Sequence, residues 1–353
     1  MSLAHAQRGP QSSPASAPKG QGGAAQDAIG ELVDLQAVMG NGALAAHLVE
    51  QAGEQTWGPS WLRGLDHARI NQQDIGSIEE DGDRKQQVAP LPQLRETHKD
   101  SSYQDFENGA AFVQGQGDEH EVNANDAKQG SLGDCYLIAG MIAVARANPQ
   151  AIKDIIKDNG DGTFDVTLYI RTSAYGPARA QVVTVDARLP VKTQDSPLYA
   201  KVGDKADGKD ELWPALIEKA VAQKKGSYEL ISGGNINKNG FNFAGATELL
   251  TGKRENYFAF TRLDEDDILL MAAFALEDKL PVICSTRSDM EGDEAATREA
   301  NAVNVYWNHA YPVESVDLDK RTVSFQNPWG SHHVKDLPIA DVKRFYSSIR
   351  VGS

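Results

Sequence analysis

Three residues whose side chains can together perform nucleophilic catalysis follow one another along the chain: Cys135, His309 and Asn327. Cys135 follows a glycine-rich turn and opens an apolar run, so we expect its thiol at a helix N-terminus, where the helix dipole favours a thiolate. An imidazole beside a thiol can take its proton, and a third polar group can hold that imidazole in the useful tautomer. The order Cys, His, Asn therefore predicts an acyl-transfer site.

Two further side chains fit the same chemistry. Gln129 lies six residues before Cys135 and can supply one donor to an oxyanion, with the backbone N–H of Cys135 as the second. Trp329 follows Asn327 closely, and we expect it to shield the His309–Asn327 hydrogen bond from water, which strengthens such a bond. Each of these residues alone is more often structural than catalytic, so the prediction rests on the whole set.

The elements that must position these residues can be read from hydrophobic periodicity and from Gly and Pro signals. A helix is expected from Cys135 to about Ala147 and a second from Leu212 to Val221, ended by Gly226. Strands are expected over 164–170, 182–185, 282–285, 303–307, 309–316 and 322–326. A helical first half and a β-rich second half indicate an α+β fold, with the site in a cleft between the halves.

We divide the chain into three parts. Residues 1–30 are rich in Ala, Gly, Ser, Gln and Pro and are expected to be a disordered leader. Residues 31–100 are expected to form a helical hairpin and a linker that serves as a targeting or pro-segment. The compact catalytic core is expected over 101–353.

Composition narrows the function classes. The formal net charge is −15, from 50 acidic and 35 basic residues, and no basic stripe carries interleaved aromatic residues, so nucleic acid is not an expected partner. The sequence contains no run of 18 apolar residues, so it predicts no membrane-spanning helix. The two cysteines form neither a disulfide framework nor a zinc motif, and Cys284 lies in an apolar strand where a structural role is expected.

The core resembles the calpain-like cysteine proteases, members of the papain-fold group. The motifs that carry this resemblance lie at 129–137, 186–190, 212–220, 226–229, 232–234, 309–311 and 327–330. The resemblance implies a papain-like fold of two lobes and endopeptidase activity on protein substrates, with Cys135 as nucleophile, His309 as base, Asn327 as its orienting group and Gln129 in the oxyanion hole. Tyr136 departs from the family pattern, which has Trp beside the nucleophile.

The resemblance also raises the question of calcium. Asp126, three residues before Gln129, lies where the family has a calcium ligand, and Glu119 and Glu121 are near it in sequence. Calcium prefers several hard oxygen ligands, which these carboxylates can supply, although an ordinary solvated acidic loop has the same composition. Gly208 stands where the partner acid of that site is expected. We therefore expect no required cofactor and a calcium dependence that is partial or absent.

The N-terminal segment leaves the biological setting open. Residues 35–48 resemble a short motif near the start of bacterial proteins associated with injection systems and polymorphic toxins. That resemblance implies a delivered effector loaded into a secretion apparatus through residues 1–60. The expected location is the cytoplasm of the producing cell, or outside it by a route without a signal peptide. Two alternatives to proteolysis stay open: another Cys-dependent acyl transfer, such as a transglutaminase-like or deamidating activity, and a protein-binding pseudo-protease.

Overall fold

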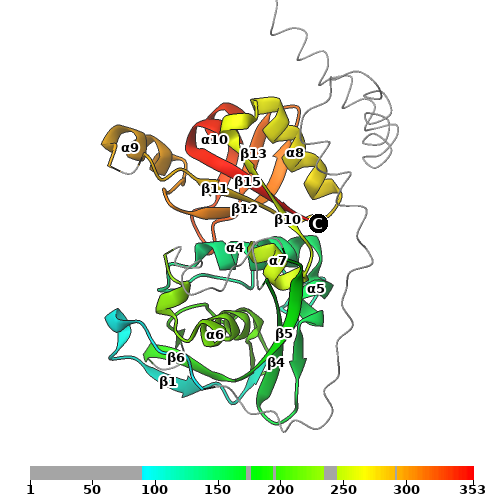
Figure 1. The fold of residues 1–353 in the computed structure, drawn as a ribbon, viewed down its shortest axis with the longest axis vertical. Helices are drawn as coiled ribbons and strands as arrows, with labels where there is room; N and C mark the ends of the chain where they lie inside the picture. The colour runs from blue at the N-terminus through cyan, green and yellow to red at the C-terminus, as the bar shows by residue number, and fades with distance from the viewer. Residues whose placement is uncertain (1–89, 172–175, 194–195, 234–244, 291) are drawn as a thin grey trace, which may run out of the picture. The chain divides into compact units, whose positions relative to one another are not determined.

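The computed structural model describes residues 90–171, 176–193, 196–233, 245–290 and 292–353. The predictions for residues 1–30 and for 31–89 lie outside these ranges. The described part is a mixed α+β fold with two hydrophobic cores, as the sequence predicts (Figure 1). We call the described residues of 90–251 the N-terminal lobe and those of 255–353 the C-terminal lobe.

The N-terminal lobe contains the helix that begins at the predicted nucleophile. Its elements are η1 (Glu96–His98), β1 (Ser102–Asp105), β2 (Gly109–Ala110), α4 (Cys135–Ala147), α5 (Pro149–Asp154), β3 (Ile156–Asp158), β4 (Thr163–Arg171), β5 (Ala178–Asp186), β6 (Arg188–Thr193), β7 (Ser196–Pro197), β8 (Lys205–Ala206), β9 (Lys209–Glu211), α6 (Trp213–Lys225), η2 (Glu229–Ile231) and α7 (Ala246–Thr251). Its strands form three small sheets, in the orders β1-β6-β7, β2-β9-β8 and β3-β4-β5. The first half is therefore richer in strands than the sequence patterns indicate.

Helix α4 is apolar on every side because it is enclosed by both lobes. Nine consecutive residues, Leu137–Ala145, are buried. Gly140 lets α7 approach closely, since a Cβ at this position would lie 2.4 Å from the Cβ of Ala246. Ala139 and Ala143, on another part of the helix, pack against Ile283 and Ala310 of the C-terminal lobe. In Figure 1, α4 accordingly runs between the two lobes.

The C-terminal lobe is built on one antiparallel sheet of six strands, in the order β10-β15-β11-β12-β13-β14. Its elements are β10 (Glu255–Ala259), η4 (Phe260–Arg262), α8 (Glu265–Glu277), β11 (Val282–Thr286), α9 (Glu294–Ala302), β12 (Ala310–Asp317), β13 (Thr322–Phe325), β14 (Val334–Pro338), α10 (Ile339–Phe345) and β15 (Tyr346–Gly352). Helix α8 begins with a capping box, in which the side chains of Asp264 and Asp267 each accept the other residue's backbone N–H. Cys284 is buried in β11, in keeping with its expected structural setting.

The strand predicted over 303–307 is wrong. These residues form the turn that follows α9, a helix that the sequence patterns did not reveal. Asn304 and Asn308 adopt positive φ angles of 62° and 55°, which bend the chain out of an extended path. The backbone N–H of Tyr306 donates to the Tyr311 hydroxyl instead of a neighbouring strand. The apolar residues Val303, Val305 and Trp307 therefore alternate with polar residues in a tight loop and not in a β-strand.

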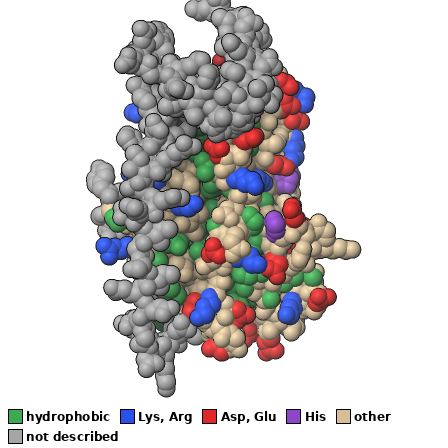
Figure 2. All heavy atoms as spheres, turned by 90° about the vertical axis from the view of Figure 1, so that its right-hand side faces the viewer, with side chains coloured by type: hydrophobic (Ala, Val, Ile, Leu, Met, Phe, Trp, Pro, Cys, Tyr) green, Lys and Arg blue, Asp and Glu red, His purple; other side chains and the backbone are tan. Residues whose placement is uncertain are grey.

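Residues 90–101 lie along the N-terminal lobe. Gln93 and Gly226 share a backbone hydrogen bond of 3.1 Å, and the Tyr103 hydroxyl donates to the carbonyl of Pro92. Within the described ranges, no helix combines the length and the apolar character needed to cross a bilayer. On the face drawn in Figure 2, the coloured residues mix acidic and basic side chains without a continuous area of one charge.

Candidate active site

Cys135 is the first residue of α4, as predicted, and the preceding turn needs glycine. A Cβ on Gly130 would lie 1.9 Å from the carbonyl oxygen of Tyr199, so only glycine lets residues 129–131 approach this backbone. The Ser131 N–H donates to the Leu198 carbonyl, which fixes the turn to the N-terminal lobe. The local sequence therefore places the half-buried thiol of Cys135 at the start of a rigid helix.

His309 and Asn327 come from neighbouring strands of the C-terminal lobe. His309 directly precedes β12, and Asn327 lies two residues after β13. These strands pair antiparallel, with Val313 opposite Phe325 and a register shift between Val313 and Ser315, so the two side chains meet at the strand ends. The distance from His309 Nε2 to Asn327 Oδ1 is 3.0 Å, and both residues are buried.

The hydrogen bonds around Asn327 fix the tautomer of His309. The backbone N–H of Trp329 donates to Asn327 Oδ1 at 3.1 Å, so this atom is the amide oxygen and not the nitrogen. The partner of this oxygen on the ring, His309 Nε2, must then carry the proton. In the neutral imidazole Nδ1 is left with its lone pair, which is the form that can accept a proton from a thiol.

The Cys135 thiol faces the start of β12 across the contact between the lobes. A hydrogen bond from the Ala310 backbone lowers the pKa of the thiol, but burial dominates and raises the pKa to about 11. Burial also lowers the pKa of His309, while the Asn327 contact raises it. Burial therefore opposes a charge on both groups, whereas the helix N-terminus and these hydrogen bonds favour it.

Gln129 is held by both lobes. Its backbone N–H donates to the carbonyl of Pro328 at 2.8 Å, and its Nε2 donates to the carbonyl of Leu132 at 2.6 Å. The side-chain amide also contacts the carboxyl of Asp134. The turn that carries Asn327 thus supports the backbone of the predicted oxyanion residue, a link between lobes that the spacing did not reveal.

Trp329 lies against His309, with ring centroids 4.8 Å apart. Its other neighbour is Tyr306, at 4.6 Å. The indole is 41% exposed, so it lies between the imidazole and solvent. This is the position that a shield for the His309–Asn327 bond requires.

A buried pair of carboxyl groups lies directly behind Cys135. Asp134 and Glu218 are 0% and 1% exposed, and their carboxyl groups contact one another. Two carboxylates cannot donate to each other, so a shared proton satisfies the contact. Burial raises the pKa of Asp134 to about 7 and that of Glu218 well above its usual range. Glu218 also accepts the backbone N–H of Ala200.

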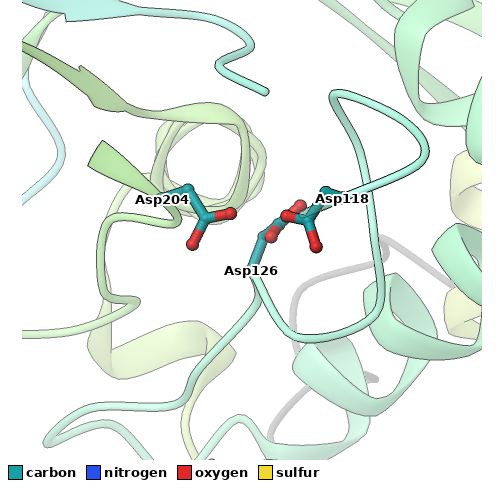
Figure 3. A group of neighbouring side chains, drawn as sticks. All are labelled: Asp118, Asp126 and Asp204. Atoms are coloured by element: carbon teal, nitrogen blue, oxygen red, sulfur yellow. The ribbon is translucent and has the colours of Figure 1, made fainter. Parts of the chain in front are cut away.

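The predicted metal ligands are only partly brought together. Asp126 lies beside Asp118 and Asp204, and one carboxylate oxygen from each lies within 4.8 Å of the others (Figure 3). Glu119 is exposed and Glu121 forms an ion pair with Lys153, so neither belongs to this cluster. The sequence pattern did not identify Asp118 and Asp204, because Asp204 reaches Asp126 from a separate loop.

The Asp118–Asp126–Asp204 cluster has the chemistry that a hard cation requires. Asp126 Oδ2 accepts N–H groups from Asn123 and Trp213, whereas its buried Oδ1 has no partner. Burial raises the pKa of Asp126 to about 6. Burial together with the Asp126 charge raises the pKa of nearby Glu211 to about 8. A divalent cation would relieve the cost of these crowded charges.

Comparison with known proteins supports the same assignment of the core. Residues 109–337, more than half of the chain, match the family model described as calpain family cysteine protease. Similar proteins include calpain clp-4 of Caenorhabditis elegans, 28% identical over 212 residues, which make up 58% of this chain and 27% of that protein. Mouse calpain-12 is 27% identical over 219 residues, which cover 60% of this chain and 27% of the relative.

The catalytic subunit of mouse calpain-2 is 30% identical over 217 residues, which make up 58% of this chain and 28% of the relative. The matched part of this chain therefore spans about a quarter of the length of these curated relatives. The family model nevertheless covers both lobes and all three residues of the predicted site. The chain belongs to the calpain family of cysteine proteases.

Proposed function

We propose that this chain is a cysteine endopeptidase that cleaves protein substrates with Cys135 as nucleophile, His309 as general base and acid, and Asn327 as the group that orients His309. The observation that carries the proposal is the bond between His309 Nε2 and Asn327 Oδ1, because it leaves Nδ1 as the proton acceptor. Membership of the family supports the reaction class.

In this mechanism the thiol proton passes to His309 Nδ1 while the Cys135 sulfur attacks the scissile carbonyl carbon. Gln129 and the Cys135 backbone N–H stabilise the oxyanion. The C–N bond then breaks as His309 returns the proton to the leaving amine, and a thioester remains. Water adds to this thioester with His309 as base, and rupture of the C–S bond releases the acid and restores the thiol.

The first test is site-mapped alkylation of the folded protein with a low dose of iodoacetamide at neutral pH. Cys284 is the internal control, because it is 2% exposed and burial raises its pKa. We expect Cys135 to react faster than Cys284 and to lose this advantage in His309→Ala. Equal labelling of the two cysteines in the full chain, and again after removal of residues 1–89, would count against the proposal.

Products then separate proteolysis from its alternatives. Digestion of casein by wild type but not by Cys135→Ala, with new N-termini detected by mass spectrometry, would support an endopeptidase. A mass change of about one unit, or a cross-link, would instead indicate deamidation or transglutamination. A biological effect that survives Cys135→Ala would favour a protein-binding pseudo-protease.

For calcium, we propose binding at Asp118, Asp126 and Asp204 with a partial effect on activity. The partnerless, buried oxygen of Asp126 supports a cation at this position. Only Asp126 of the predicted ligands is retained, and none of the three catalytic residues belongs to the cluster. A steep calcium activation that Asp126→Ala abolishes would contradict a partial role.

We also propose that residues 1–60 act as a loading signal and that the protease is a delivered effector. The support is the sequence resemblance of residues 35–48 alone. Deletion of residues 1–60 should abolish export from the producing cell while leaving Cys135 labelling intact. If deletion instead raises the activity, the segment acts as a propeptide that covers the cleft.

A further inference from the structure

The backbone N–H of Asn327 has an unusual acceptor. It donates to the imidazole Nδ1 of His333 at 3.0 Å, across the loop that joins β13 to β14. Asn327 is 0% exposed, so no bulk water can replace this acceptor. A buried N–H without a partner costs about 1–3 kcal/mol, so the position of Asn327 depends on the state of a second histidine.

His333 also holds the loop that leads to His309. Its backbone carbonyl accepts a hydrogen bond from Asn304 Nδ2 at 3.0 Å. The loop from Asn304 to Asn308 carries Tyr306, whose ring packs on Trp329. His333 therefore connects the two loops that carry His309 and Asn327. Among the described residues, it forms no hydrogen bond with the Cys135 thiol or with the His309 ring.

We propose that His333 is a positioning residue: its neutral imidazole accepts the Asn327 N–H and thereby keeps the His309–Asn327 pair assembled. The inference rests on the proposed function for its catalytic consequence. Nδ1 can accept only in the neutral tautomer that carries its proton on Nε2. Protonation turns Nδ1 into a donor that faces the Asn327 N–H, so the pair loses its support in acid.

The surroundings of His333 favour the neutral ring. Burial lowers the pKa of His333 most, and the cations Lys335 on β14 and Arg146 on α4 lower it further. The neighbouring His332 acts in the same direction, whereas Glu314 on β12 raises the pKa. Glu314 is itself paired with Lys335, which weakens its pull.

The sign of the pH effect follows from this lowered pKa. The unfolded chain takes up the proton near the usual value of 6.5, before the folded state does. The hydrogen bond therefore contributes fully above about pH 6.5, and its contribution is lost as the pH falls through the lower folded pKa. An acid loss of activity should follow.

Three variants test this inference in the full chain, with casein as substrate between pH 4.5 and 8. His333→Ala removes the acceptor, and we expect about a tenfold loss of kcat with little change of KM across this range. His333→Asn supplies an amide oxygen near the position of Nδ1 that does not titrate, so it should restore kcat and keep activity to lower pH than wild type. His332→Asn replaces the adjacent exposed imidazole and should keep wild-type kcat at pH 8.

A second readout does not depend on catalysis. The backbone amide signal of Asn327 in NMR spectra should shift with the titration of the His333 ring in wild type and should stay fixed in His333→Asn. If wild type is active, and both His333 variants keep its kcat and its loss of activity in acid, the inference is wrong and the protease proposal stands. An inactive wild type whose Asn327 amide still follows His333 would reject the proposed function but retain the positioning contact.

Discussion

The two lobes satisfy their buried polar groups in different ways. The N-terminal lobe buries Asp126, Asp134, Glu211 and Glu218, and the pKa of each of these carboxyls is raised, mainly by burial. The C-terminal lobe buries mainly neutral groups around its part of the site, and its buried Glu255 is paired with Arg350. The N-terminal lobe therefore holds carboxyl groups whose charge is opposed by burial, whereas the C-terminal lobe relies on neutral hydrogen bonds around its part of the candidate site.

The strongest predicted loss of activity concerns the side chain of Gln129, which bonds within the N-terminal lobe. Gln129→Ala removes the side-chain donor to the oxyanion, and we expect a loss of about 10²–10³ in kcat on casein. The fold should persist, because the backbone bond from residue 129 to the Pro328 carbonyl is retained. Gln150→Ala, on the exposed side of α5, is the matched control and should keep wild-type kcat. Turnover near wild type in Gln129→Ala would remove this residue from the oxyanion hole.

The second prediction tests the uncompensated acids of the N-terminal lobe. A buried carboxyl with a raised pKa keeps its proton when the unfolded chain has lost it, so wild-type stability should fall as pH rises from about 4 to 8. Glu218→Gln removes one such group and still can bond Ala200 and Asp134. We expect a flatter dependence of Tm on pH and, at pH 8, a Tm about 2–4 °C above wild type, which corresponds to ~1 kcal/mol.

Glu248→Gln is the contrasting variant, because Glu248 is buried in the same lobe but forms a two-point ion pair with Arg171. Removing that charge leaves the guanidinium without its partner, so we expect destabilisation at every pH from 5 to 8. If Glu218→Gln and Glu248→Gln changed the dependence of Tm on pH in the same way, the proposed difference would be wrong. That difference is between a carboxyl that shares a proton with another carboxyl and one that pairs with a cation.

A stability change of similar size is expected at the Asp118–Asp126–Asp204 cluster. Millimolar Ca²⁺ should raise the Tm of wild type by about 2–4 °C at pH 8, and by less at pH 5, where Asp126 holds a proton. Asp126→Asn should remove most of this shift. Glu119→Gln, at an exposed position outside the cluster, should leave it unchanged. A calcium shift that persists in Asp126→Asn would place the cation elsewhere.

Local patterns predicted much of the fold. The helix that begins at Cys135 and the paired strands before Asp186 agree with the structure because their periodicity and turn residues are local signals. The strand prediction for 303–307 was wrong because a short alternation of apolar and polar residues also occurs in turns. The positive φ angles of Asn304 and Asn308 make this segment a turn. The small sheets of the N-terminal lobe were missed since strands such as β8 and β9 are only two or three residues long.

The chemical types at the candidate site and their order can be predicted from the amino-acid sequence alone. Cys135, His309, Asn327 and Gln129 lie in motifs whose composition is specific. The sequence also indicates the family, through matches spread over both lobes. Three contacts become visible only in the folded chain: Asp204 lies near Asp126, Asp134 contacts Glu218, and His333 accepts the Asn327 N–H. These contacts depend on how loops close after the two cores have packed, and loop closure leaves no periodic signal in the chain.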